Sequence, residues 1–193
     1  EEDRFVVITD GDHLMNLTLI WRDEIPADWK GLPGEDRRIA AKIPVDMGDA
    51  MRTALQSEQS VVISGYGAAV VNNEPRNSFD KLPGQMNSLL VGFMGNSPVH
   101  QPYGVQKMEW NPESRELEYS WVNKMVSSPN AMPIVSKGSN AFYTVGARDT
   151  NWTIEGLDWS TGEEIFHYVV GDQKYNSLFS GVLLDEKGDL MYG

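Results

Sequence analysis

Cysteine is absent from this 193-residue chain. The sequence therefore contains no disulfide, no thiolate metal ligand and no cysteine nucleophile. A chain without cysteine suits a bacterial periplasmic or secreted protein and a cytoplasmic protein equally, so the compartment stays open. No apolar run approaches the roughly 18 residues that a membrane-spanning helix needs, and the start, Glu1-Glu2-Asp3-Arg4, has no basic-then-apolar signal pattern. We expect no membrane span.

Positive charge is also scarce. The chain has 16 Lys and Arg against 28 Asp and Glu, a net charge of −12. This balance argues against a nucleic-acid partner, because phosphate contacts need Lys and Arg. Histidine is rare as well, and its 3 copies show neither His-x-x-x-His spacing nor a Ser/His/Asp arrangement. Of these, His167 is expected to be structural.

An internal repeat is the main feature that the sequence does contain. Three segments end in tryptophan after an apolar residue two positions earlier, and each is followed by a polar turn. A second alternating segment follows two of the turns, which is typical of a β-hairpin. The tryptophan-ended segments are 17–21, 106–110 and 155–159, and the segments that follow are 116–122 and 164–170.

Two further strands precede each hairpin in the predicted repeat. An alternating run lies upstream of the tryptophan at 5–9 and 141–145, and an apolar run that ends in a turn lies ahead of it at 60–64, 132–136 and 181–185. Phe5 to Trp21 and Phe142 to Trp159 have nearly equal spacing, so we place Trp21, Trp110 and Trp159 at equivalent positions. Helix is expected only at 48–55. Four-stranded units with a recurring tryptophan strand favour a β-propeller, and a β-sandwich is the competing all-β fold.

The predicted fold class is thus all-β, a β-propeller of four-stranded blades. The chain holds about three blade-equivalents of a six- to eight-bladed ring. Three blades cannot close a ring and would leave strand edges bare, so the remaining blades come from missing sequence or from a second copy. The expected units are 5–47 without its first strand, 58–123 with an insertion at 74–102, a complete blade at 128–171, and the start of another at 175–193.

Two propeller groups share short motifs with this chain. Residues 156–163 (GLDWSTGE) resemble the x-L-D-x-x-T-G-E turn of quinoprotein-like (PQQ-like) repeats, which implies a repeat and no quinone pocket. Residues 129–134 (PNAMPI) and 179–188 (FSGVLLDEKG) resemble the P-N-G-I opening and the D-G-I-x-x-D-x-x-G strand of the gluconolactonase and senescence-marker-protein-like group. That resemblance implies a divalent metal at the channel mouth, with Asn130 at the family's asparagine and Ser180 where the family often has aspartate.

A candidate site follows from aligning the ends of the three apolar runs at Ser64, Ser136 and a position near Glu186. Six residues before these positions we expect side chains that face the central channel, namely Glu58, Asn130 and Ser180. A carboxylate, an amide and a hydroxyl suit Ca²⁺ or another divalent cation, with Glu58 and Asn130 as the metal ligands. They equally suit a small polar ligand, or ordered water at strand ends.

Two more residues complete the predicted ligand-binding set. Asn176 lies in the loop before the last apolar run, and His100 lies in the long insertion, where repeat proteins often build binding faces. The function we expect is a binding or scaffold propeller that presents a channel-mouth site to a small polar ligand or a protein partner. The alternative is a metal-assisted hydrolase of gluconolactonase type, and a quinone-dependent dehydrogenase is the weakest of the three. No cofactor other than a divalent cation is indicated.

Overall fold

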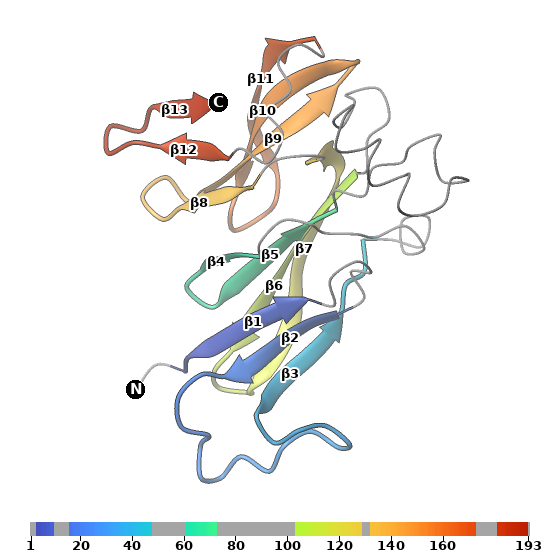
Figure 1. Cartoon of the computed structure of the whole chain (residues 1–193), viewed down its shortest axis with the longest axis vertical. Coiled ribbons are helices and arrows are strands. Elements are labelled where there is room, and N and C mark those ends of the chain that lie inside the picture. The colour runs from blue at the N-terminus through green and yellow to red at the C-terminus, as the bar shows by residue number, and fades with distance from the viewer. Residues whose placement is uncertain are drawn as a thin grey trace, which may run out of the picture.

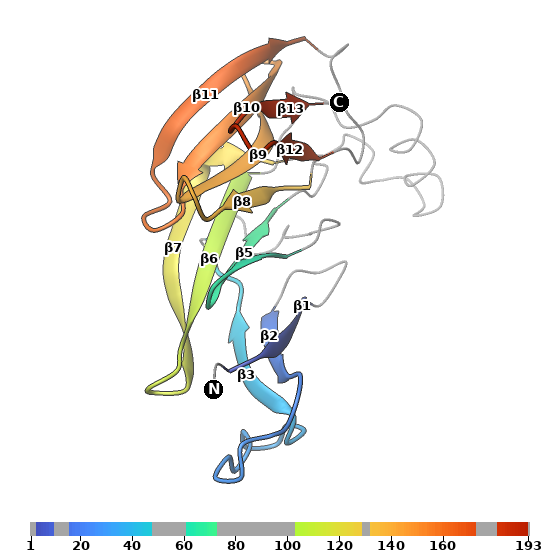
Figure 2. The same cartoon turned by 90° about the vertical axis from the view of Figure 1, so that its left-hand side faces the viewer.

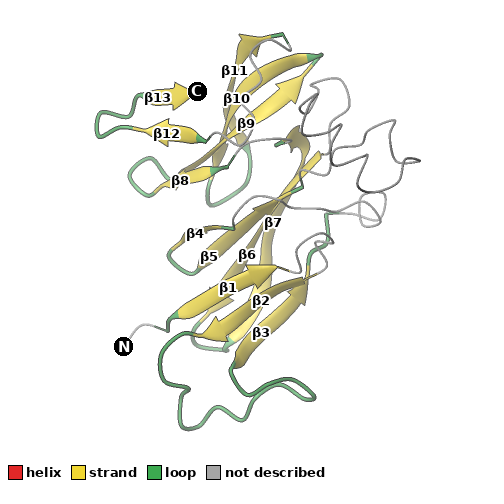
Figure 3. Ribbon diagram, in the orientation of Figure 1, coloured by secondary structure: helices red, strands yellow, loops and turns green. Residues whose placement is uncertain are grey.

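Strands form all the regular secondary structure that can be described. The computed structural model describes residues 3–9, 16–47, 61–72, 103–128, 132–172 and 181–192. Within these ranges there is no helix, hence none that could cross a membrane, and Figure 3 shows strands joined by loops. The predicted all-β class is confirmed. The expected helix at 48–55 and the insertion at 74–102 lie outside the described residues.

The described strands form four antiparallel sheets, of which three are simple meanders and the last is a two-stranded hairpin. Sheet 1 contains β1 (Phe5–Thr9), β2 (Asn16–Trp21) and β3 (Ile39–Pro44). Sheet 2 contains β4 (Val62–Ser64), β5 (Gly67–Val71), β6 (Tyr103–Asn111) and β7 (Glu116–Ser127). Sheet 3 contains β8 (Ile134–Ser136), β9 (Ala141–Arg148), β10 (Asn151–Asp158) and β11 (Glu164–Gly171). Sheet 4 contains β12 (Val182–Leu184) and β13 (Leu190–Tyr192).

The sheets follow one another in sequence order along the molecule (Figure 1). The short strands β4, β8 and β12 succeed each other along one side (Figure 1), whereas the long strands β7 and β11 lie on the side away from β8 and β12 (Figure 2). Direct contacts join β4 to β8 and β8 to β12. A parallel bridge between Met132 and Gly181 also links sheet 3 to the start of sheet 4.

Apolar clusters fill the spaces between successive sheets. β5 shows the principle, since all its side chains are buried. Ala68 and Val70 face sheet 1, while Ala69 and Val71 face sheet 3. Alternate residues of a strand point to opposite faces, so an uninterrupted apolar strand is the pattern that a sheet packed on both sides requires. A similar cluster around Trp152 and Val182 joins sheet 3 to sheet 4.

A β-bulge recurs at one place in the last hairpin of each larger sheet. The register shifts between Leu19 and Ile20 in sheet 1, between Lys107 and Met108 in sheet 2, and between Gly156 and Leu157 in sheet 3. Because bulges fix the pairing of the residues around them, they allow the three sheets to be aligned residue by residue. Trp110 and Trp159 are equivalent in this alignment, and Arg22 is the residue of sheet 1 that matches them.

Backbone hydrogen bonds give the same alignment. The amides of Trp110 and Trp159 donate to the carbonyls of Tyr66 (3.0 Å) and Asn140 (2.8 Å), and in sheet 1 the corresponding donor is Arg22, to Arg4 (2.9 Å). The prediction that Trp21 is the third equivalent tryptophan is therefore wrong. Trp21 lies one residue earlier, and a shift of one residue turns a side chain to the opposite face of the sheet.

Trp21 therefore points toward sheet 2 and packs against Trp110, with ring centroids 5.9 Å apart and the planes at 88°. Trp110 and Trp159 instead point back toward the preceding sheet. Trp110 reaches Phe5 of β1, 4.9 Å between centroids, and its Nε1 donates to Asp3 (3.0 Å). The sequence did not indicate this difference in register, because the spacing from Phe5 to Trp21 is nearly equal to that from Phe142 to Trp159.

Candidate functional site

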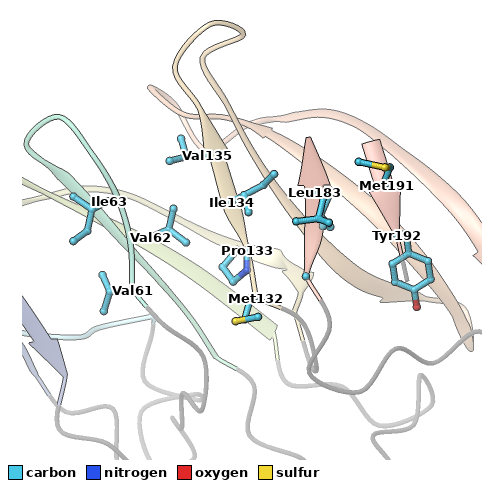
Figure 4. Close-up of a pocket in the computed structure, with 12 residues that line it drawn as sticks. Val61, Val62, Ile63, Met132, Pro133, Ile134, Val135, Leu183, Met191 and Tyr192 are labelled. Carbon is cyan, nitrogen blue, oxygen red and sulfur yellow. The ribbon is translucent and has the colours of Figure 1, made fainter. Parts of the chain in front are cut away.

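An apolar groove runs across the short strands and β13. Its volume is about 640 Å³, and Figure 4 shows side chains from three successive sheets along it. The lining residues are 61–63 of sheet 2, 132–135 of sheet 3, and 181–183 and 191–192 of sheet 4. Few of these residues offer a polar side chain, so the groove is a surface for apolar contact.

Four large side chains in the groove are strongly exposed. The exposed fractions are 51% for Ile63, 43% for Met132, 61% for Leu183 and 52% for Met191. Apolar side chains that gather on a surface in this way often mark an interaction site. Each short strand is apolar at consecutive positions because one face packs against the preceding sheet and the other is turned toward the following one.

Tight turns position these strands. Gly65 adopts φ +60° after β4 and Gly188 adopts φ +89° after β12, in the left-handed region that glycine occupies without strain. In the second turn, the Asp185 carboxylate accepts hydrogen bonds from the amides of Lys187 and Asp189, both at 2.8 Å. The acidic run after β12 is therefore a hairpin turn, as its sequence indicated.

The main cluster of titratable groups lies in sheet 3. Arg148 donates to both carboxylate oxygens of Glu155, at 2.9 and 2.7 Å, and to Glu164 at 2.6 Å. Thr153 adds a hydrogen bond to Glu155, and Nδ1 of His167 lies 2.8 Å from Glu164. The Glu155 side chain is only 1% exposed.

The charges of this cluster offset one another, because the Arg148 guanidinium contacts the carboxylates of Glu155 and Glu164. The carboxylate of Glu155, followed by that of Glu164, raises the pKa of Arg148. The His167 ring, followed by Arg148, lowers the pKa of Glu164. Ligand atoms of Glu155, Glu164 and His167 lie within 4.8 Å of one another, but the guanidinium already supplies the positive charge there. We interpret the cluster as a structural ion-pair network, with His167 as one of its members.

The turn that resembles quinoprotein-like repeats joins β10 to β11 within sheet 3 and packs against sheet 2. The Asp158 side chain accepts from the amides of Ser160 (2.8 Å) and Thr161 (2.9 Å), and these bonds lower the pKa of Asp158, with the Thr161 amide as the largest cause. Gly162 follows with φ +73°, and its Cα faces the ring of Trp121 of sheet 2. In this chain, residues 156–163 thus include a turn that packs against sheet 2.

The ligand-binding residues predicted from the sequence lie outside the described residues. They are Glu58, His100, Asn130, Asn176 and Ser180. Their convergence, a bound Ca²⁺ or other divalent cation, and the hydrolase reading all stay predictions. One step in choosing them does need correction. Ser64 pairs with Gly67, and Ser136 pairs with Ala141. The residue of sheet 4 that is equivalent to Ser64 and Ser136 is Asp185, whose amide donates to the carbonyl of Asp189.

This register moves the third position of the alignment. Six residues before Asp185 stands Phe179, not Ser180, so the gapless alignment no longer selects Ser180. Sequence reasoning also missed the groove itself. The signal was present as consecutive apolar residues just before the turn in each short strand, at 61–63, 133–135 and 182–184, but we used it only to define strands.

Comparisons with known proteins extend over the whole chain but over less than half of each match. No family model matches the chain. An uncharacterised protein of Archaeoglobus fulgidus is 41% identical over an alignment 194 residues long, which covers 100% of this chain and 38% of the relative. The solved structure of BamB from Moraxella catarrhalis superimposes with a TM-score of 0.49 and 13% identity, over 98% of this chain and 41% of that one. The chain spans about two fifths of both.

Proposed function

We propose that this chain is part of a β-propeller that binds a partner protein through apolar contacts along the groove of the short strands. Four-stranded antiparallel meanders packed face to face are the blades of a propeller. Two complete meanders stand in the middle of this chain, with a three-stranded sheet before them and a two-stranded sheet after them. In such an arrangement the short strands are the innermost strand of each blade, and the groove faces the channel.

The apolar lining of the groove, in which Met132 of sheet 3 is 43% exposed, carries this proposal. Covering apolar surface stabilises a complex by roughly 25 cal/mol per Å², a gain that an apolar protein segment obtains and a small polar molecule does not. The described groove thus favours a protein partner. A small polar ligand would instead depend on the predicted rim residues Glu58, Asn130, Asn176, Ser180 and His100.

The remaining blades are best assigned to further sequence of a longer protein. The curated relative extends well beyond the matched region, which supports this source. The alternative was a second copy whose β1 would pair with β12. In sheet 4, however, β13 already pairs with β12 along its length, so a second copy would have to displace β13.

The neutral dye Nile red tests whether the groove binds apolar groups. We expect its fluorescence to rise on binding the chain, and this rise to fall several-fold in the Leu183→Ser/Met191→Ser double variant. The matched control is Ile165→Ser, since Ile165 is 52% exposed on β11, away from the groove. Equal loss in the control, or an undiminished rise in the double variant, would remove the groove as the binding site.

A further inference from the structure

Charged side chains are unevenly distributed along the groove. Each short strand ends in a turn, and the three turns differ in charge. The β4–β5 turn contains no charged residue, and the β8–β9 turn contains only Lys137. The β12–β13 turn, residues 185–189, contains three carboxylates and one lysine. The end of the groove at sheet 4 is therefore acidic.

The conformation of the β12–β13 turn places this negative charge beside the groove. The Asp185 carboxylate fixes the turn by accepting two of its backbone amides, each at 2.8 Å, whereas the side chains of Glu186 and Asp189 are exposed. Glu186 follows Leu183 by three residues, and Asp189 precedes Met191 by two. Both carboxylates thus adjoin the strands whose side chains line the groove at this end (Figure 4).

Among the residues that the structure describes, no cationic side chain lines the groove. The lining consists of apolar residues together with Gly181 and Tyr192, and the whole chain has a net charge of −12. An excess of one charge raises the local concentration of partners with the opposite charge. Charges at the rim of an interface speed the association of such partners and disfavour like-charged ones. The acidic end therefore favours a partner with positive charge next to its apolar residues.

We propose that the groove binds a segment of another protein in which Lys or Arg adjoins the apolar residues, and that these basic residues face Glu186 and Asp189. This inference rests on the proposed function, because it names the kind of partner that the groove takes. The apolar residues supply most of the binding free energy, since an exposed ion pair contributes at most about 1 kcal/mol. The acidic turn supplies selectivity and orientation.

Three labelled peptides test this selectivity by fluorescence anisotropy. The first joins an apolar core to two lysines, the second joins the same core to two glutamates, and the third joins a serine core to two lysines. At about 20 mM salt we expect the first to bind about tenfold more tightly than the second. At about 300 mM salt this ratio should fall to about threefold or less, because salt screens exposed charges. The third should bind weakly throughout, and Leu183→Ser/Met191→Ser should weaken the binding of the first two.

Charge reversal at the turn locates the effect. The Glu186→Lys/Asp189→Lys variant should remove the preference for the lysine peptide over the glutamate peptide. The matched control is Glu113→Lys/Glu116→Lys, which changes the net charge by the same amount. These two residues are also exposed and lie at the β6–β7 turn, outside the groove lining. The control should keep most of the preference.

The outcomes separate this inference from the proposed function. Equal dissociation constants for the first two peptides, or equal effects of the two charge reversals, would overturn the inference and leave the groove as an apolar binding site. A serine-core peptide that binds as tightly as the first would also overturn it, because the attraction would then not need the groove. If neither apolar-core peptide bound and Nile red fluorescence did not rise, the proposed function itself would be removed.

Discussion

The indole Nε1 of Trp121 donates a hydrogen bond to the backbone carbonyl of Trp159, 2.9 Å away. The two rings meet edge to face, with centroids 6.4 Å apart. Trp121 belongs to the last strand of sheet 2 and Trp159 to the turn that ends β10 in sheet 3. This pair, with Asn123 donating to the carbonyl of Gly162 at 2.8 Å, fixes one sheet on the next.

A side chain at Gly162 should weaken this junction. A Cβ there would lie 2.5 Å from ring atoms of Trp121, and φ is +73°. The Gly188→Ala control shares the positive φ, +89°, but has nothing within 4 Å, so it should cost only about 1 kcal/mol of backbone strain. We expect Gly162→Ala to cost about 2 kcal/mol more, measured by urea denaturation. Equal costs at the two positions would show that the junction does not hold the sheets together.

Loss of Arg148 should destabilise sheet 3. Arg148→Leu leaves the buried Glu155 carboxylate without its partner, which we expect to cost about 3 kcal/mol of the free energy of unfolding. The control is Arg115→Leu, which removes an ion pair to Asp28 whose side chain is 74% exposed and should cost at most about 1 kcal/mol. The double variant Arg148→Leu/Glu155→Leu should recover most of the loss. A single variant as stable as the control would contradict the assignment of this network as structural.

Stability should fall in acid through Asp158 and Glu164. Both have folded-state pKa values below their ordinary values of 3.8 and 4.5, because hydrogen bonds stabilise their charged forms. The unfolded chain therefore takes up protons first as the pH falls. The contribution is fully present above about pH 5 and is lost as the pH drops through the folded-state values.

Urea midpoints measured from pH 6 to pH 3 would check this dependence. Asp158→Asn/Glu164→Gln should show a shallower fall than the parent chain, because these positions then no longer titrate. Asparagine keeps an acceptor oxygen for the amides of Ser160 and Thr161, so the turn should persist. A double variant with an unchanged slope would assign the acid sensitivity to other groups.

The strands were predictable from sequence because their signals are local. The runs that we described as alternating, at 5–9 and 141–145, correspond to β1 and the first part of β9. The register of Trp21 was not predictable, since it depends on how Leu19 and Ile20 pair across β2 and β3. That pairing joins residues far apart along the chain, and spacing alone does not report a one-residue shift.

The candidate site was less accessible to sequence reasoning. We looked for polar side chains at strand ends, and the five selected residues lie outside the described ranges. The groove arises because β4, β8 and β12 meet through the packing of three sheets, which no local pattern records. The sequence of β12 is apolar and predicts a buried strand. The exposure of Leu183 follows only from the positions of the neighbouring strands in the folded chain.

A divalent cation at the predicted rim is testable without further structure. If Glu58 and Asn130 hold Ca²⁺, adding Ca²⁺ should raise the melting temperature relative to EDTA, since a ligand that binds only the folded state stabilises it. Asn130→Ala should abolish that shift. Identical melting curves in Ca²⁺ and EDTA would exclude a stabilising Ca²⁺ site formed by Glu58 and Asn130.

The account depends on each sheet packing face to face on the next one along the chain. Nuclear Overhauser effects between assigned side chains of successive sheets measure this packing most directly. We predict contacts from Trp110 to Phe5, 4.9 Å between centroids, and from Trp159 to Trp121 and to the Lys107 side chain, whose Nζ lies 4.7 Å from the Trp159 ring. A contact between Trp159 and the Phe5–Trp21 pair of sheet 1 in place of these would mean that the sheets face each other as a sandwich, and it would contradict the propeller.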